Sequence, residues 1–404
     1  MPRIQPQQFY VIGHNPNTKD DAESYLKAGC NALEPDVCFS SKPSHPDRYY
    51  VSHDHVSSDQ DSYDFDHEHS LANYMQGIKD LILRNNYNLA LIWFDYKDSP
   101  DGDINDLLQI VHDNFTVYDQ KCANVAIMVS VAHISDAAFV NNYDQSISNA
   151  GVAIDQDDNA EGVLNNFTAA LETRFAYADG IMVGGSPIGI YKSVMQAKVL
   201  QAQATDPDKQ FKMVHTWVLA ADNSLRSYLD LHIDGIIVNV STVPTLLSIL
   251  QEPHYQPMYK LAVNGYNPWG APPIPKYWGK VQTADTMWAG TDALVNLTLT
   301  GTNGSLVCPI HGDWAGVLEQ GDENNVTWQG FDLGTITSLK AELGNNAGSG
   351  PDWLPAMITV GGNLMPETLF FNFGPNDWVK FGAPITKSPE QSPAMLKASG
   401  GQAL

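Results

Sequence analysis

The chain has 404 residues, of which 43% are hydrophobic and 10% aromatic, so it can bury a sizeable core and is not a disordered chain. Its 46 acidic residues against 22 basic ones give a formal net charge of −24, which excludes binding to nucleic acid through its phosphates and attraction to an anionic membrane. At roughly 100–200 residues per domain, the length predicts two domains, or one large domain with an extension. No run of about 18 apolar residues occurs, so the sequence predicts no membrane-spanning helix.

Short apolar runs alternate with amphipathic stretches as far as residue 250. The runs predict strands at Phe9–His14, Ala32–Phe39, Tyr49–His53, Leu89–Tyr96, Val125–Ala132, Val152–Asp155, Asp179–Val183, Phe211–Val218 and Asp234–Val240. Helical periodicity predicts helices at Asp20–Ala28, Leu71–Leu83, Ile104–Phe115, Ala160–Phe175, Ile188–Gln203, Ser224–Leu231 and Val243–Leu250. About eight such units in roughly 250 residues favour an α/β fold of the (β/α)8 TIM-barrel type. A doubly wound open sheet is the alternative, but no Gly-x-Gly-x-x-Gly follows the first strand.

The pattern changes after a Pro-rich break that follows residue 270. Beyond it, short alternating strands such as Leu294–Thr300 and Ala356–Val360 are separated by turns rich in Gly, Asn and Asp, which is typical of an all-β sandwich. The division that we expect is a barrel (1–270), a Pro-rich linker (271–276), a β-sandwich (277–383) and a disordered tail (384–404).

The four cysteines are Cys30, Cys38, Cys122 and Cys308. Cys30 and Cys38 flank an expected strand and therefore lie about 20 Å apart, which is too far for a disulfide bond. We expect free thiols, with a Cys30–Cys122 bond as the alternative.

Polar residues interrupt the apolar strands near their carboxyl ends, where the active sites of barrels lie. They are His14, Glu34, Asp36, His53, Asp95 and Lys97. Any one of them could be an ordinary capping or core residue, but the whole set at one face favours a functional site. Glu34 and Asp36 lie two apart in a strand, so their side chains point to the same face.

Three carboxylates that converge in a cleft repel one another strongly unless a cation neutralises them. Ligation by oxygen alone favours Mg²⁺ or Ca²⁺ over Zn²⁺. Two histidines beside such a site form an acid/base pair near neutral pH. A metal, a lysine and two histidines together suit phosphoryl chemistry, because the cations hold phosphate oxygens while the histidines move protons.

The segments that carry these residues also carry a resemblance. They read Ile-Gly-His14-x-x-Asn, Ala-Leu-Glu34-x-Asp36-Val, Tyr-x-x-His53 and Phe-Asp95-x-Lys97, and later Ala-Asp179-Gly-Ile, Thr-Trp217-Val, Gly-Ile-Ile-Val-Asn239 and Ala262-Val-Asn-Gly-Tyr-Asn267-Pro268-Trp269. Over residues 9–270 the chain resembles the glycerophosphodiester phosphodiesterase-like fold. It resembles more closely the sphingomyelinase D/phospholipase D toxins of spider venoms and their bacterial and fungal relatives.

The resemblance implies a role for each matched residue. Glu34, Asp36 and Asp95 would bind one Mg²⁺, His14 would attack phosphorus or act as base, His53 would protonate the leaving alcohol, Lys97 would hold a phosphate oxygen, and Asp179 and Asn239 would line the cleft. Trp217 would receive a quaternary ammonium group by cation–π attraction, or would be a plain aromatic residue of the barrel rim. The implied reaction is phospholipase D-type cleavage of the headgroup of sphingomyelin or lysophospholipids, which can release a cyclic phosphate.

Three departures from the family pattern lie around this site. His215 replaces a tyrosine two residues before the tryptophan, and Ala220 replaces an acid three residues after it. The loop at residues 52–69 lacks the cysteine of the venom enzymes and is rich in His and Asp, so it is either a solvated loop or a second metal site.

The C-terminal part carries a second resemblance. The segment Ala284-Asp-Thr-Met-Trp-Ala-Gly290-Thr291-Asp292 and the turn Gly-Pro351-Asp-Trp353 resemble a PLAT (lipoxygenase-homology) sandwich over about residues 277–383. That resemblance implies docking on lipid and leaves Ca²⁺ in the loops open. Trp288 and Trp353 would be either interfacial anchors or ordinary core.

Together these observations predict a Mg²⁺-dependent phospholipase D-type phosphodiesterase that meets a zwitterionic membrane surface through its C-terminal domain. Its partners would be phospholipid or lysophospholipid substrates and no nucleic acid, and we expect a monomer. A soluble glycerophosphodiester phosphodiesterase is the alternative within the class, and a non-catalytic lipid-binding protein is the alternative outside it. We expect a secreted protein whose signal peptide is not part of this sequence, with a cytoplasmic protein as the alternative.

Overall fold

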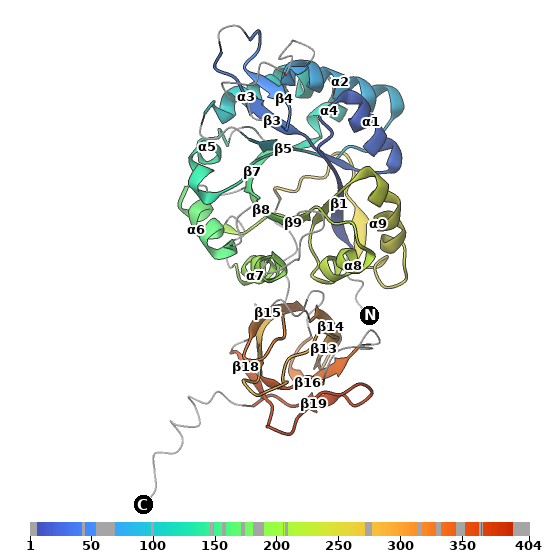
Figure 1. Ribbon diagram of the computed structural model, residues 1–404, viewed down its shortest axis with the longest axis vertical. Helices are drawn as coiled ribbons and strands as arrows, with labels where there is room; N and C mark the ends of the chain where they lie inside the picture. Colours follow the sequence, from blue (N-terminus) through green and yellow to red (C-terminus); the bar gives the residue numbers. More distant parts are fainter. Residues whose placement is uncertain are drawn as a thin grey trace, which may run out of the picture.

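The computed structural model describes residues 6–42, 45–53, 69–97, 101–145, 147, 149–155, 159–170, 174–180, 190–204, 206, 209–270, 277–312, 317–328, 333–344, 352–362, 365 and 367–390. Figure 1 shows a ring of strands surrounded by helices, with a smaller all-β part beside helices α7 and α8.

Parallel strands form a closed barrel. In chain order they are β1 (Gln7–His14), β2 (Ala32–Glu34) with its continuation β3 (Asp36–Phe39), β5 (Leu91–Tyr96), β6 (Ala126–Val131), β7 (Ala150–Ile154), β8 (Phe175–Gly180), β9 (Val214–Trp217) and β10 (Gly235–Val238). Each strand pairs in parallel with the next, and β10 pairs with β1, so the sheet closes on itself. The predicted TIM barrel is confirmed and the open sheet is excluded. Two further strands join it: β4 (Tyr49–Val51) pairs antiparallel with β3, and β11 (Tyr259–Leu261) pairs with the start of β1.

Helices cover the outside of the barrel (Figure 1). They are α1 (Lys19–Ala28), α2 (Leu71–Asn85), α3 (Ile104–Val111), α4 (Gln120–Ala123), α5 (Ala137–Asn141), α6 (Ala160–Ala170), α7 (Ile190–Gln203), α8 (Asp222–Asp230) and α9 (Val243–Leu250), with short π or 3-10 turns at His112–Thr116, Ile134–Asp136 and Val240–Thr242. In α2, the Ser70 hydroxyl accepts a hydrogen bond from the Asn73 backbone N–H and caps the first turn. The residues that α2 buries are the predicted apolar ones, at helical spacing.

Several predicted boundaries shift by a few residues, and two of the differences have a clear physical reason. The strand expected at Ala32–Phe39 is split at Pro35, because proline has no amide hydrogen to give to the sheet. The helix expected at Ala160–Phe175 ends at Ala170, and Phe175 instead begins β8. Its ring lies 5.0 Å from that of Phe167 and 6.0 Å from that of Phe211, so burial between aromatic neighbours overrides the helical periodicity. Of the strand expected at Asp179–Val183, the last three residues lie outside the described part.

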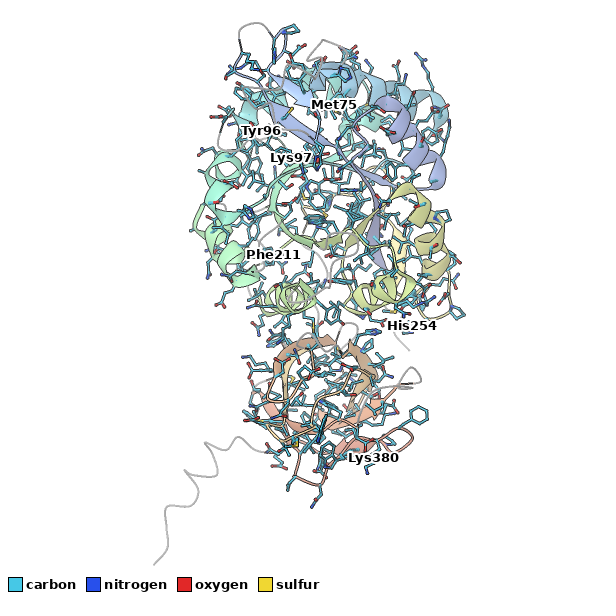
Figure 2. The ribbon with its side chains drawn as sticks, viewed as in Figure 1. Met75, Tyr96, Lys97, Phe211, His254 and Lys380 are labelled. Atoms are coloured by element: carbon cyan, nitrogen blue, oxygen red, sulfur yellow. The ribbon has the colours of Figure 1, made fainter. Side chains whose placement is uncertain are left out.

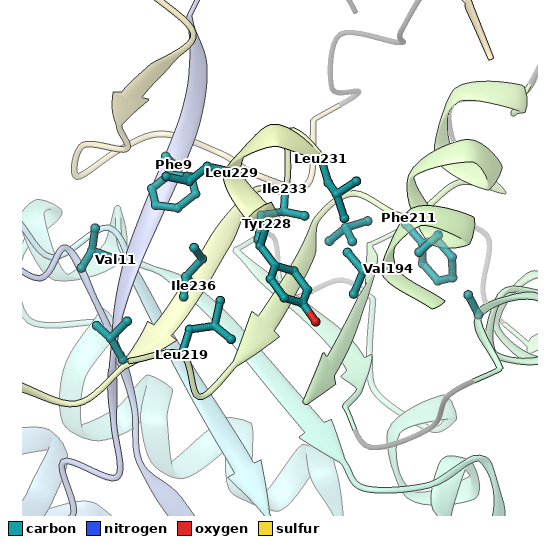
Figure 3. Packing of buried hydrophobic residues seen from close by; sticks show 14 of the residues in the cluster. Phe9, Val11, Val194, Phe211, Leu219, Tyr228, Leu229, Leu231, Ile233 and Ile236 are labelled. Carbon is teal, nitrogen blue, oxygen red and sulfur yellow. The ribbon is translucent and has the colours of Figure 1, made fainter. Parts of the chain in front are cut away.

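Apolar side chains pack on both faces of the barrel sheet. Figure 3 shows the outer layer, where Phe9, Val11 and Ile236 from the strands face Val194, Leu229 and other residues of the helices. A second cluster fills the inside of the barrel and includes Ile12, Trp93, Met128, Ile237 and Trp269. The interior is therefore a packed core, as in other barrels of this type.

Trp269 closes the amino-terminal end of the barrel. Its indole N–H donates to the carbonyl oxygen of Asn149, one residue before β7, over 3.1 Å. A Cβ atom added to Gly151 would lie 2.4 Å from the Trp269 ring. Glycine is needed at this position because the ring lies directly against the backbone.

Residues 277–390 form the predicted sandwich of two antiparallel sheets. Its strands are β12 (Tyr277–Thr283), β13 (Leu294–Gly301), β14 (Gly304–His311), β15 (Glu323–Trp328), β16 (Ile336–Leu343), β17 (Pro355–Gly362), β18 (Leu369–Asn372) and β19 (Ile385–Lys387). The sheet orders are β15-β12-β17-β18 and β14-β13-β16-β19. The tail expected from residue 384 is corrected at its start, because β19 pairs with β16 and completes the second sheet. The expected linker 271–276 and residues 391–404 lie outside the described part.

All four cysteines are free and buried, which confirms the expected thiols. Among the helices described here, none is both long and apolar enough to cross a membrane.

The sandwich packs against α7 and α8 of the barrel through β12, β14 and β15 (Figures 1 and 2). Lys192, in the first turn of α7, forms an ion pair with Asp322 of the sandwich. The imidazole Nε2 of His311 lies 2.6 Å from a carboxylate oxygen of Asp230, the last residue of α8. His254 approaches the other oxygen of the same carboxylate at 3.4 Å. An ion pair from α7 and a hydrogen-bonded contact from α8 therefore join the two parts.

Candidate active site

The strand register brings the predicted residues together at the barrel mouth, the face formed by the carboxyl ends of the strands. His14 lies opposite Glu34 in the β1–β2 pair. Asp36 lies opposite Asp95 in the β3–β5 pair, and Asp95 lies opposite Ser130 in the next pair. Residues far apart in the sequence thus become neighbours on adjacent strands.

The carboxylates of Glu34, Asp36 and Asp95 form a buried acidic cluster. Each offers an oxygen atom, and these atoms lie within 4.8 Å of one another. All three residues are buried, with at most 5% of their surface exposed. Burial raises the pKa of Glu34 well above its usual value, and repulsion from Asp36 and Asp95 raises it further. Burial also raises the pKa of Asp95. Three close oxygen donors in a buried site fit a hard divalent cation, which would relieve this repulsion.

Lys97 supplies a positive charge to this cluster. Its ammonium group lies 2.8 Å from a carboxylate oxygen of Asp36 and also bonds to Asp95. Burial lowers the pKa of Lys97, but the two aspartates outweigh this effect and raise it above its usual value. The lysine therefore carries its charge at neutral pH and lies directly beside the acidic cluster.

Two asparagines that we did not assign from the sequence hold the acidic cluster. The side chain of Asn17 donates to Asp36 over 2.7 Å and accepts from the Asp36 backbone N–H over 2.9 Å. The backbone N–H of Asn15 donates to Glu34 over 3.0 Å. Asn17 is the asparagine of the His14-x-x-Asn motif, so the sequence did mark it. That it bonds to Asp36 could not be identified without the fold.

His14 ends β1 and contacts the opposite side of the mouth. Its Nδ1 atom lies 3.3 Å from the amide oxygen of Asn239, and its carbonyl accepts from the hydroxyl of Tyr25 over 2.8 Å. Burial lowers the pKa of His14 below its usual value, although the hydrogen bond to Asn239 opposes this. The imidazole is therefore neutral at neutral pH and can accept a proton.

His53 is exposed at the start of a segment, residues 54–68, that lies outside the described part. The second metal site that we considered for the loop at residues 52–69 falls almost entirely on those undescribed residues.

The remaining predicted residues occupy the far side of the mouth. Trp217 ends β9, is partly exposed, and donates its indole N–H to the carbonyl of Asp155 over 2.9 Å. Asp179 lies in β8 opposite Thr216, but its side chain is outside the described part. His215 is fully buried, and its ring lies 5.0 Å from that of Trp93.

The two tryptophans of the sandwich differ. Trp353 is completely buried and donates its indole N–H to the Thr283 hydroxyl over 3.1 Å. Trp353 is therefore a core residue, and the alternative that it is an interfacial anchor is wrong. Trp288 is 75% exposed and its neighbour Met287 is 71% exposed.

Comparison with known families decides the affiliation of the barrel. The family described as dermonecrotic toxin SPH matches residues 5–269. The chain belongs to this family. A PLAT/LH2 domain family matches residues 279–384. Both resemblances inferred from the motifs are thereby confirmed.

Individual relatives are distant. The dermonecrotic toxin StSicTox-betaIF1 of Sicarius terrosus is 23% identical over 64% of this chain and 98% of its own length. LbSicTox-betaIA1a of Loxosceles boneti is 23% identical over 66% of this chain and 99% of its own. The toxin SpeSicTox-betaIF1 of Sicarius peruensis is 25% identical, and the match spans 57% of its length and 37% of this chain.

Two solved structures with some similarity each match about 30% of this chain. Coral 8R-lipoxygenase is 24% identical over 30% of this chain and 19% of its own, with a TM-score of 0.24. The alpha toxin from Clostridium absonum is 17% identical over 29% of this chain and 31% of its own, with a TM-score of 0.23. The chain thus spans less than a third of the length of these proteins.

Proposed function

We propose that this protein is a Mg²⁺-dependent phospholipase D-type phosphodiesterase that removes the headgroup of sphingomyelin or lysophospholipids. The observation that carries the proposal is the buried acidic cluster of Glu34, Asp36 and Asp95 within 4.8 Å, with His14 on the neighbouring strand. Membership of the dermonecrotic toxin family supports it.

Glu34, Asp36 and Asp95 would hold the Mg²⁺. When bound, the ion would offset the negative charge that develops on the phosphate oxygens. Lys97, which lies beside the same carboxylates, would hold one of these oxygens. The substrate phosphate would thus be oriented between the acidic cluster and His14.

The histidines would move the protons. If the Nδ1–H of His14 donates to the Asn239 oxygen, the unprotonated Nε2 is left to attack phosphorus or to take a proton from the substrate's own hydroxyl. His53 would then give a proton to the leaving alcohol. Attack by the substrate's hydroxyl would release a cyclic phosphate, whereas attack by water would release a phosphomonoester.

The test is headgroup release from sphingomyelin and lysophosphatidylcholine vesicles by the purified chain with Mg²⁺. We expect choline release that EDTA abolishes. His14→Ala should reduce this release at least 1,000-fold, because the variant lacks the imidazole that would attack phosphorus or accept the proton. Phosphorus NMR of the product distinguishes a cyclic from a hydrolysed phosphate.

Other results would point to the alternatives. Turnover of glycerophosphocholine alone would identify a soluble diesterase. Vesicle binding without release of any headgroup would identify a non-catalytic lipid-binding protein. Activity that survives EDTA or the His14 substitution would contradict the mechanism.

We also propose that the sandwich docks on a zwitterionic membrane surface. Met287 and Trp288 support this, because two adjacent large apolar side chains exposed to water suit insertion at an interface. Trp288 also has a φ angle of 69°, a region that bulky residues rarely adopt.

Four further expectations stay part of this proposal. Secretion fits the toxin names of the relatives, and Ca²⁺ in the sandwich loops fits the PLAT match. The protein would act as a monomer. The domain boundaries at 270 and 277 are supported by the ends of the two family matches, at 269 and 279.

A further inference from the structure

The sequence contains six Asn-x-Ser/Thr sequons, the tripeptides that accept N-linked glycans in the secretory pathway. Their asparagines are Asn114, Asn166, Asn239, Asn296, Asn303 and Asn325. A glycan is bulky and hydrophilic, so it needs an asparagine whose side chain reaches solvent. The structure describes all six asparagines, so each can be judged by its exposure and its contacts.

The three barrel asparagines have surroundings that a glycan would disrupt. The side-chain N–H of Asn114 donates to the preceding helical turn over 2.9 Å, and its amide oxygen accepts from Gln76 of α2 over 3.0 Å. The amide nitrogen of Asn166, the atom that would carry the sugar, is buried. Asn239 lies 3.3 Å from His14 in the barrel mouth, where a glycan would block the candidate active site.

Two of the sandwich asparagines lie inside paired strands. Asn296 is half-buried in the middle of β13 and is paired on both sides, with β14 and with β16. A glycan there would crowd the side chains of both neighbouring strands. Asn325 is in β15, which packs against α7 of the barrel. Thr327 points to the same face of β15 and is only 8% exposed, so this face is covered.

Asn303 differs from the other five asparagines in both respects. It is exposed, and it lies in the two-residue turn that joins β13 to β14. Its backbone N–H donates to the Leu333 carbonyl over 3.0 Å, so the turn is held through its main chain. Ser305, which completes the sequon, is also exposed. A surface turn of this kind is where a glycan is best accommodated.

The position of this turn keeps a glycan away from the other parts of the molecule. Leu294 pairs with His311 at one end of the β13–β14 hairpin, and the turn closes the other end, roughly 24 Å away along the strands. His311 contacts Asp230 of the barrel, and the loop that carries Trp288 leads into β13 at the same end. A glycan on the turn would therefore lie far from both the barrel and the proposed docking loop.

We propose that Asn303 is the N-glycosylation site of this chain and that its glycan marks the end of the sandwich that stays in water. The inference rests on secretion, which is part of the proposed function. The side-chain nitrogen of Asn303 attacks the anomeric carbon of a lipid-linked oligosaccharide diphosphate. The new carbon–nitrogen bond forms as the bond from that carbon to the diphosphate oxygen breaks. The lipid diphosphate leaves, and the amide proton passes to a base of the host's oligosaccharyltransferase.

The test is peptide mapping of the full chain, produced behind a cleavable secretion leader in a eukaryotic host that attaches high-mannose glycans. Endoglycosidase H leaves one N-acetylglucosamine on each occupied asparagine, so mass spectrometry locates the sites. We expect this sugar on most copies of the Asn303 peptide and on none of the other sequon peptides. A secreted chain with no sugar on Asn303, or with sugar on another sequon, would overturn the proposal.

Two variants remove the sequon by different routes, Asn303→Gln and Ser305→Ala. Both should lose the added mass completely, and Ser305→Ala answers the question alone if Asn303→Gln is not secreted. Asn296→Gln is the matched control, because it makes the same substitution within the adjoining strand and should keep the glycan. Added mass that persists in Ser305→Ala, or is lost in Asn296→Gln, would contradict the assignment.

A second measurement tests where the glycan lies. Sedimentation with zwitterionic vesicles is compared for the secreted protein before and after treatment with endoglycosidase H. We expect the same binding, because the turn is at the far end of the sandwich from Trp288. Weaker binding of the untreated protein would overturn the placement of the glycan in water. The peptide map requires no enzymatic activity, so an inactive protein would contradict the proposed function and not this inference.

Discussion

Asn17 contacts Asp36 at two points, in addition to the ion pair that Asp36 forms with Lys97. It bonds both to the Asp36 carboxylate and to the Asp36 backbone N–H, so the loop after β1 helps to fix the central member of the acidic cluster. Partners that orient metal ligands in this way usually influence affinity nearly as much as the ligands themselves.

We therefore expect Asn17→Ala to weaken Mg²⁺ binding by about 10-fold to 100-fold. Mg²⁺ affinity is measured by titration calorimetry, and the dependence of the activity on Mg²⁺ concentration is measured as well. Asn73→Ala on the exposed side of α2 is the control and should leave the affinity unchanged. An unchanged Mg²⁺ affinity in Asn17→Ala would show that Asp36 does not depend on this contact.

Substitutions of the two sandwich tryptophans should have opposite effects on stability and on vesicle binding. Trp288→Ala should leave the free energy of unfolding within about 0.5 kcal/mol, because its side chain is exposed, but should weaken vesicle binding about tenfold. Trp353→Ala should destabilise the protein by about 3–5 kcal/mol through the cavity that it leaves. Chemical denaturation and vesicle sedimentation measure the two effects, and unaltered sedimentation of Trp288→Ala would reject the docking surface.

At the scale of elements, the sequence allowed the barrel to be predicted because each strand–helix unit carries its own periodicity. The positions of His14, Glu34, Asp36 and Asp95 followed from the rule that strand ends meet at one face. The hydrogen bond from Trp217 to Asp155 could not be predicted, because it depends on how strands distant in the sequence lie beside one another. Phe175 was misplaced for a similar reason, since its aromatic neighbours come from elements distant in the chain.

The plug at the amino-terminal end of the barrel gives a prediction at this scale. Gly151→Ala places a methyl group against the Trp269 ring, so we expect a loss of about 1–3 kcal/mol in the free energy of unfolding. Gly270→Ala is the control, because its Cβ would lie at an ordinary 3.5 Å from the Asn267 carbonyl. Denaturation with urea measures both, and a double change with Trp269→Leu should recover part of the loss. Equal stability of the two alanine variants would exclude the steric contact.

At the scale of the whole molecule, we expect the joint between barrel and sandwich to be sensitive to pH. Burial raises the pKa of Asp230, but hydrogen bonds from His254 and His311 outweigh this and lower it. The Asp230 contribution to stability is therefore present above about pH 4 and is lost as pH falls through its lowered pKa. The hydrogen bond to Asp230 raises the pKa of His254. The His254 contribution is present in full below about pH 6.5 and is lost as pH rises through its raised pKa.

Comparison of the unaltered protein with His254→Gln isolates the contribution of His254 to stability. The difference in Tm between the two should be largest below about pH 6.5 and should shrink as pH rises. Differential scanning calorimetry between pH 5 and 9 measures it. Lys79→Gln is a control that lies far from the joint and should give a difference independent of pH in this range. A His254→Gln difference that grows with pH would contradict the assigned ion pair.

The contact between Lys192 and Asp322 has one more consequence. Lys192 lies in the first turn of α7, which follows the carboxyl end of β8, so Asp322 is held on the mouth side of the barrel. The loop that carries Trp288 is tied to the same place, because the Gly321 N–H donates to the Ala284 carbonyl. If the sandwich docks on a bilayer as proposed, the enzyme would take its lipids from that same surface. Its rate would then follow the density of substrate in the surface rather than its concentration in the bulk solution.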